Sequence, residues 1–127
     1  MAEIEEAFVD DMKAQSTITS IVGSKVYAHE AGDSAIDSYV VVTNPSNPRS
    51  AFTQSDYGGI GRVSIYCHAR TVADSRTLGN AVLDLYKQRT GTVQGVTVQW
   101  IEVSNARMLY GPGSEFRYLV DLVVHYT

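Results

Sequence analysis

The stretch TVADSRTLGNAVLDLYKQRTG, residues 71–91, has the start and stop signals of a helix, and strand-like sequence lies on both sides of it. Thr71 is a suitable N-cap residue, and Asp74 three positions later completes a capping box. Gly91 stands where a left-handed C-cap is expected. We therefore predict a helix over residues 71–90, about 28 Å long, which is enough to cross a small sheet.

One face of this predicted helix is apolar. Five residues at three- and four-residue spacing share that face: Val72, Gly79, Val82, Leu83 and Tyr86. A helix with a single apolar stripe buries that stripe against a neighbouring element, so we expect a sheet to pack on it.

The length and composition of the chain predict a single globular domain over residues 1–127. With 127 residues, 44% of them hydrophobic and 19% charged, the chain is long enough for a hydrophobic core without disulfide or metal support. The net charge is −4 and the basic residues are scattered, which argues against a general nucleic-acid binder. No apolar run reaches the roughly 20 residues that cross a bilayer, so we expect no membrane contact.

Cysteine use and the N-terminal sequence indicate a reducing compartment. The single cysteine, Cys67, excludes an internal disulfide and a cysteine-rich zinc site. It alternates with Val63 and Ile65, so we predict a buried and inert thiol. The N-terminal sequence MAEIEEAF is acidic and lacks the apolar core of a secretory signal. We expect the protein to be made and used in the cytoplasm.

Residues 2–15 have the periodicity of an amphipathic helix. Ile4, Phe8 and Met12 recur every four residues and predict its buried face. Acidic residues are concentrated here, near the N-terminal end where they suit the helix dipole: Glu3, Glu5, Glu6, Asp10 and Asp11. We interpret them as a solvated face. The functional alternative is an acidic surface that repels DNA or meets a basic partner.

The next segments predict a helical turn, two extended segments and a polar loop. Residues 17–22 form the turn, which Gly23 ends, and residues 25–27 are extended. Residues 36–43 contain the run YVVV and predict a strand buried on both faces or nearly so. Between them, residues 29–37 predict an exposed loop. It contains four side chains that can bind metals: His29, Glu30, Asp33 and Asp37. Neither the HExxH nor the EF-hand pattern is present, so we predict no metal site here.

Residues 44–60 also predict a loop, which runs into the tract YGGIG at residues 57–61. A P-loop requires a Gly-Lys-Ser/Thr sequence that is absent, and a dinucleotide fingerprint requires a helix after the glycines, where a strand is expected. We therefore predict no cofactor. About seventeen residues is longer than compact domains normally keep in a loop without a purpose, so we expect a partner to order it.

Three further strands complete the predicted fold. Residues 62–69 alternate, with Val63, Ile65 and Cys67 facing one side. Residues 93–104 predict a strand with a bulge near Trp100, where the parity of the apolar residues changes. Residues 105–114 predict a loop, and residues 115–126 a strongly alternating strand. The order of elements predicts an α+β domain, in which an N-terminal helix and a central helix pack on one face of a mostly antiparallel sheet.

No combination of residues predicts catalysis, and we assign no catalytic, cofactor-binding or metal site. His68 and His125 lie on predicted strands and would meet only if those strands were neighbours. Cys67 and His68 are adjacent in one strand and therefore point to opposite faces. The chain has eight tyrosines, a residue type enriched at protein interfaces, which favours an assembly subunit over an enzyme.

Four features, taken in order along the chain, are similar to those of one protein family. They are the N-terminal helix leading into IVGSKVY at residues 21–27, the strand SYVVV at 38–42 before a polar loop, the segment VSIYCHA at 63–69 running into the helix, and the closing strand YLVDLVVHY at 118–126. On these features the chain resembles the tail-completion, or tail-terminator, proteins of long-tailed bacteriophages.

The resemblance implies a structural protein without catalytic residues. It implies a homo-oligomeric ring, usually of six copies, on the last ring of the tail tube at its head-proximal end. Such a ring stops tube polymerisation and joins the tail to the head, so the implied partners are the tail tube protein and the head–tail connector proteins. DNA would pass through the lumen without specific binding. The implied location is the virion, after assembly in the host bacterial cytoplasm.

Two other functions stay open at this point. One is a different ring subunit of the virion, namely a head-completion or tail-tube protein. The other is a small enzyme or ligand-binding domain with His68 and His125 as its polar pair. Within the assembly interpretation, we expect residues 44–60 and 105–114 to contact the tube or the connector and to become ordered on docking.

Overall fold

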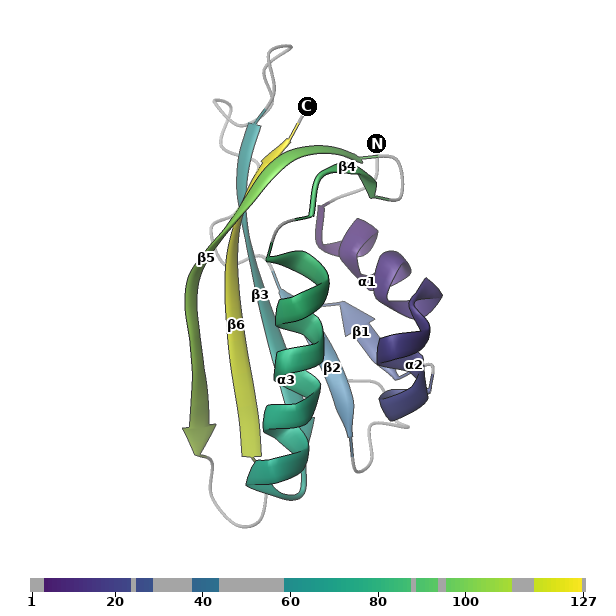
Figure 1. The fold of residues 1–127 in the computed structure, drawn as a ribbon, viewed down its shortest axis with the longest axis vertical. Coiled ribbons are helices and arrows are strands. Elements are labelled where there is room, and N and C mark those ends of the chain that lie inside the picture. The colour runs from purple at the N-terminus through teal and green to yellow at the C-terminus, as the bar shows by residue number, and fades with distance from the viewer. Residues whose placement is uncertain are drawn as a thin grey trace.

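The computed structural model describes residues 4–23, 25–28, 38–43, 59–87, 89–93, 96–110 and 116–126. Within these ranges the chain forms three helices and one sheet with the strand order β1-β2-β3-β6-β5-β4 (Figure 1). The helices are α1 (Ile4–Ala14), α2 (Ser16–Val22) and α3 (Val72–Tyr86). The strands are β1 (Val26–Ala28), β2 (Tyr39–Thr43), β3 (Gly59–Ala69), β4 (Gly91–Val93), β5 (Val96–Tyr110) and β6 (Phe116–Tyr126).

The architecture confirms the predicted α+β class. The helices lie on one face of the sheet (Figure 1), and every strand pair is antiparallel except β1 with β2. The hydrophobic core fills the space between the helices and this face. Its fully buried members include the alternating residues expected on the strands and several from the helices: Val63, Ile65, Cys67, Val120, Leu122, Val124, Phe8, Met12, Leu78 and Val82.

The N-terminal helices agree with the sequence predictions to within a few residues. The first helix ends at Ala14, because Gln15 has extended backbone angles (φ −99°, ψ 118°) and forms the N-cap of α2. α2 ends, as predicted, at Gly23, whose φ of 64° lies in the left-handed region that favours glycine. Both helices contribute to the same core through Met12 and Ile18.

The central helix begins as predicted and ends earlier. The Asp74 amide donates a 3.0 Å hydrogen bond to Thr71 Oγ1, which confirms the N-cap. The predicted C-terminal end was wrong: the last helical residue is Tyr86. Gly91 is not a C-cap but the first residue of β4, with a φ of 96°. Because Arg89 is held by an ion pair to α1, the chain leaves the helix axis before it reaches Gly91.

Several strand boundaries differ from the sequence predictions. The strand predicted over residues 93–104 is two strands, and β5 continues to Tyr110, so the loop predicted over 105–114 was wrong up to that residue. β3 begins at Gly59, so the end of the loop predicted over 44–60 was also wrong. In both cases β6 supplies the paired neighbour, which local sequence does not reveal.

Some sequence predictions lie outside the described ranges. Residues 29–37 with their four metal-capable side chains, residues 44–58 and residues 111–115 belong to this group. The predictions that a partner orders residues 44–58 and 111–114 therefore stay predictions. For residues 105–110 the prediction of ordering on docking was wrong, because they already belong to β5.

Asp11 is buried, which corrects the interpretation of the N-terminal acids as a solvated face. Its carboxylate accepts hydrogen bonds from the Tyr86 hydroxyl (2.6 Å) and from two guanidinium nitrogens of Arg89 (2.9 and 3.3 Å). Asp11 is 3% exposed, whereas Glu6 and Asp10 of the same helix are exposed. Burial, reinforced by the Asp11 carboxylate, raises the pKa of the Tyr86 hydroxyl and keeps it a neutral donor. This cluster ties α1 to the end of α3.

Candidate assembly interface

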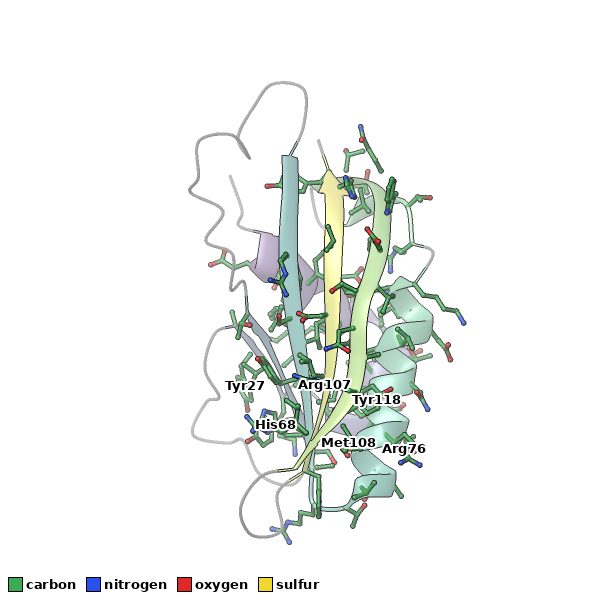
Figure 2. All side chains as sticks on the ribbon, turned by 90° about the vertical axis from the view of Figure 1, so that its left-hand side faces the viewer. Tyr27, His68, Arg76, Arg107, Met108 and Tyr118 are labelled. Carbon is green, nitrogen blue, oxygen red and sulfur yellow. The ribbon has the colours of Figure 1, made fainter. Side chains whose placement is uncertain are left out.

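We call the sheet face turned away from the helices the open face, because none of the described helices covers it (Figures 1 and 2). Residues paired directly across neighbouring strands point to the same face, so the register identifies its side chains. Its members are Trp100, Glu102, Asn105, Arg107 and Leu109 of β5; Arg117, Leu119, Asp121, Val123 and His125 of β6; Arg62, Ser64, Tyr66 and His68 of β3; Tyr39, Val41 and Thr43 of β2; and Tyr27 of β1.

The centre of the open face holds a polar cluster. Ser64 donates a hydrogen bond to the Asp121 carboxylate, and Arg62 forms an ion pair with it over 3.2 Å. Asp121 and Ser64 are 8% and 3% exposed. A carboxylate buried this deeply requires hydrogen-bond or ion-pair partners, and Ser64 and Arg62 supply them within the fold. We therefore interpret the cluster as structural.

Aromatic side chains lie at opposite ends of the open face. At one end the rings of Trp100 and His125 are 4.2 Å apart, and Trp100 is 52% exposed. At the other end His68 stacks on Tyr39 at 4.3 Å, and Tyr39 meets Tyr27 edge-on at 6.4 Å. Figure 2 shows Tyr27 and His68 close together at that end. Trp100 is exposed and the other rings are half-buried, and aromatic side chains with polar atoms are typical of protein interfaces.

The outer edge of β5 is mostly unpaired within the described part of the chain. β4 pairs with it only from Val96 to Val98, whereas β6 pairs with the inner edge as far as Tyr110. The β5–β6 register shifts between Val98 and Trp100, which confirms the irregularity predicted near Trp100, and shifts again between Val103 and Asn105. Such bulges limit uncontrolled edge-to-edge association. The backbone groups of this edge still suit pairing with a second protein.

His68 and His125 do not form a site. Their strands are neighbours, as the hypothesis of a polar pair required, but His68 lies opposite Arg117 and His125 lies opposite Ile60. Arg117 and His125 are eight positions apart on β6, so the two histidine positions are separated by about 26 Å at roughly 3.3 Å per residue. The hypothesis of an enzyme or ligand site built on this pair was wrong.

Cys67 is buried against the helices, as predicted. Its side chain is 0% exposed, and burial raises the pKa of its thiol, which keeps it protonated and unreactive. In the ranges that the structure describes, no group of three histidine, cysteine or acidic residues could hold a metal ion. No helix in the same ranges is long and apolar enough to cross a membrane.

The stability of the chain is expected to fall as the pH rises above about 9. In the unfolded chain the Cys67 thiol ionises near its ordinary pKa of 9.0, whereas burial raises its pKa in the folded chain. The unfolded state therefore binds fewer protons than the folded state above this pH, and the free energy of unfolding decreases by about 1.4 kcal/mol in total between about pH 8 and about pH 10. Urea unfolding at about pH 8 and about pH 10 measures the slope. The Cys67→Ala variant should show a clearly shallower slope, and equal slopes would contradict this assignment.

Local sequence did not reveal three features of the open face. Trp100 shares the parity of buried Val98, yet the register shift turns it to the open face. Arg107 was assigned to a loop, and the burial of Asp121 was not foreseen. The change in parity of the apolar residues at Trp100 was the one sequence signal for these features. It located the register shift but did not show which side chains the shift turns to the open face.

In the part of the chain that the structure describes, a sheet face that no helix covers, the exposed Trp100 and a largely unpaired edge of β5 define a small α+β subunit suited to assembly. The model of the family described as "Tail completion protein gp17" matches residues 6–126. The chain belongs to this tail-completion family and is a structural protein of the phage virion. The resemblance inferred from the sequence is thereby confirmed.

The fold also occurs in a solved virion. A chain of the structure "Virion of native gene transfer agent (GTA) particle" superposes with a TM-score of 0.75. The two chains are 14% identical, and the match covers 97% of this chain and 93% of that one. No individually curated protein gives a significant match.

Proposed function

We propose that the chain forms a homo-oligomeric ring, a hexamer, at the head-proximal end of the tail tube. The ring stops tube polymerisation and joins the tail to the head, so its partners are the tail tube protein and the head–tail connector proteins. The whole chain, residues 1–127, acts as one domain and is assembled in the host bacterial cytoplasm. It carries out no catalysis, takes no cofactor and contacts no membrane, and DNA passes through its lumen without specific binding.

The observation that carries this proposal is the outer edge of β5, which beyond Val98 has no strand partner among the described residues, beside the exposed Trp100. A closed ring requires an interface in which one surface of a copy meets a different surface of the next. A strand edge offers directional backbone hydrogen bonds to a neighbour's strand or loop. An exposed indole next to that edge is the kind of anchor that dominates binding energy once it is desolvated. Membership of the tail-completion family supports the position in the tail.

Tail tubes grown from the companion tube protein are expected to end in an extra terminal ring, and to stop growing, when this chain is present. Electron microscopy measures the fraction of capped tubes and their length. The Trp100→Ala variant is expected to need about 30-fold more protein for the same capped fraction, because truncating an aromatic hot spot costs about 2 kcal/mol or more.

Ile21→Ala is the matched control. Ile21 is the other large hydrophobic residue that is exposed in the described ranges (37%), and it belongs to α2 rather than to α1 or β5. It should cap tubes as the unmodified chain does. Tubes that keep growing without a terminal ring in an excess of the unmodified chain would refute the terminator role. Long polymers formed by the chain alone would show a tube subunit instead.

A further inference from the structure

Two arginines, Arg107 and Arg117, lie at one end of the open face. Arg107 is in register with Leu119 and Arg117 with Leu109, so the arginines are diagonal neighbours with Cα atoms about 7–8 Å apart. Among the residues that the structure describes, neither guanidinium has a hydrogen bond or an ion pair. Like charges at this spacing repel each other, so an anionic partner would stabilise the pair.

Among the described residues, the other charged side chains of the open face do not pair with these arginines. Asp121 is also a diagonal neighbour of Arg107, but its carboxylate is already bound by Ser64 and Arg62. Glu102 lies five positions from Arg107 along β5, in register with Val123. Counting the residues that the structure describes, this end of the open face is therefore basic, although the whole chain has a net charge of −4.

A matching acidic surface lies on the opposite layer of the molecule. Glu6 and Asp10 of α1 are exposed and four residues apart, which places them on the same face of the helix. Within the described ranges neither carboxylate has an ion pair. The helix layer that contains α1 covers the face of the sheet opposite to the open face (Figure 1).

We propose that α1 of one copy docks on the open face of the next copy, with Glu6 and Asp10 facing Arg107 and Arg117. This inference rests on the proposed ring and names the surfaces that close it. Because the two surfaces lie on opposite layers of the subunit, the contact is heterologous and repeats from copy to copy. A two-fold dimer through either surface would bring like charges together and is disfavoured. Arg107 belongs to β5, so the contact adjoins the unpaired edge.

The test uses two charge-reversed variants of the whole 127-residue chain. Arg107→Glu with Arg117→Glu makes both surfaces acidic, and Glu6→Lys with Asp10→Lys makes both basic. For each variant alone, the concentration for half-assembly at low salt is expected to rise at least about 100-fold, because every contact then joins like charges. An equimolar mixture is expected to restore assembly, because alternating copies again present opposite charges.

Assembly is measured by analytical ultracentrifugation and by the capped fraction of tail tubes. The second readout applies equally to a chain that assembles only on the tube. Arg76→Glu makes one such charge reversal at an exposed position of α3 and should assemble as the unmodified chain does. Thermal unfolding of every variant verifies that each one is folded.

Either variant assembling like the unmodified chain would overturn the inference, and so would a mixture that stays dissociated. Duplex DNA that binds the unmodified chain but not the Arg107→Glu, Arg117→Glu variant, with assembly unchanged, would assign the arginines to nucleic acid instead.

If the unmodified chain and both variants all cap tubes, the inference fails and the terminator function stands. If the mixture restores assembly but the unmodified chain caps no tubes, the terminator function fails and the contact stands.

Discussion

Replacing Asp11 by alanine is expected to lower the free energy of unfolding by about 3 kcal/mol. The buried carboxylate binds the Tyr86 hydroxyl over 2.6 Å and Arg89 through hydrogen bonds of 2.9 and 3.3 Å. Without it, a buried hydroxyl and a guanidinium whose side chain is only 23% exposed lose their partner. Deleting one member of a buried ion pair costs roughly 3–5 kcal/mol, and the partial exposure of Arg89 places the effect at the lower end.

Urea unfolding measures this loss, and Asp10→Ala is its control. Asp10 is the preceding residue of the same helix and is exposed, so its removal should change the free energy of unfolding by less than about 0.5 kcal/mol. Asp11→Asn keeps the shape of the side chain and one acceptor oxygen. Its loss of free energy of unfolding should therefore lie between those of Asp10→Ala and Asp11→Ala. Equal losses for Asp10→Ala and Asp11→Ala would show that the cluster does not hold α1 to α3.

Replacing Gly79 by valine is expected to lower the free energy of unfolding by about 3 kcal/mol. Tyr118 points from β6 toward α3 (Figure 2), and a Cβ atom at Gly79 would lie 2.2 Å from its Cδ1 and 2.5 Å from its Cγ. These ring atoms are close to the β6 backbone, so relief requires α3 and β6 to separate. Overpacking costs roughly 1–3 kcal/mol, and a β-branched side chain belongs at the upper end. The better helix propensity of valine offsets less than about 1 kcal/mol.

Thermal unfolding compares this variant with Asn80→Val. Asn80 is the next residue of α3 and is exposed, so its replacement changes helix propensity without approaching β6. Adding Tyr118→Ala to Gly79→Val should recover part of the lost stability, because the two positions are in contact. Equal melting temperatures for Gly79→Val and Asn80→Val would contradict the close approach of α3 to β6.

Elements whose signals lie within a few residues were predictable from the sequence. The hydrogen bond from the Asp74 amide to Thr71 is a local contact, so the start of α3 was correct. The alternation of Val120, Leu122 and Val124 identified the buried face of β6, because side chains of a strand alternate regardless of its partner. Gly23 ended α2 as expected, since a positive φ at that position is a local requirement. With the order of elements, these signals were enough for the fold class and the family.

Tertiary structure determined the outcome at positions where contacts with distant parts of the chain override the local preference of the sequence. Asp11 is buried because Tyr86 and Arg89, far along the chain, supply its hydrogen bonds, and the same contact helps to end α3 before Gly91. The separation of His68 from His125 follows from the register of β3 on β6, which no spacing in the sequence specifies. The sequence by itself thus determined the elements and their buried faces. The surfaces left for assembly were decided only by pairing between strands, because register shifts and unpaired edges depend on contacts between residues far apart in the chain.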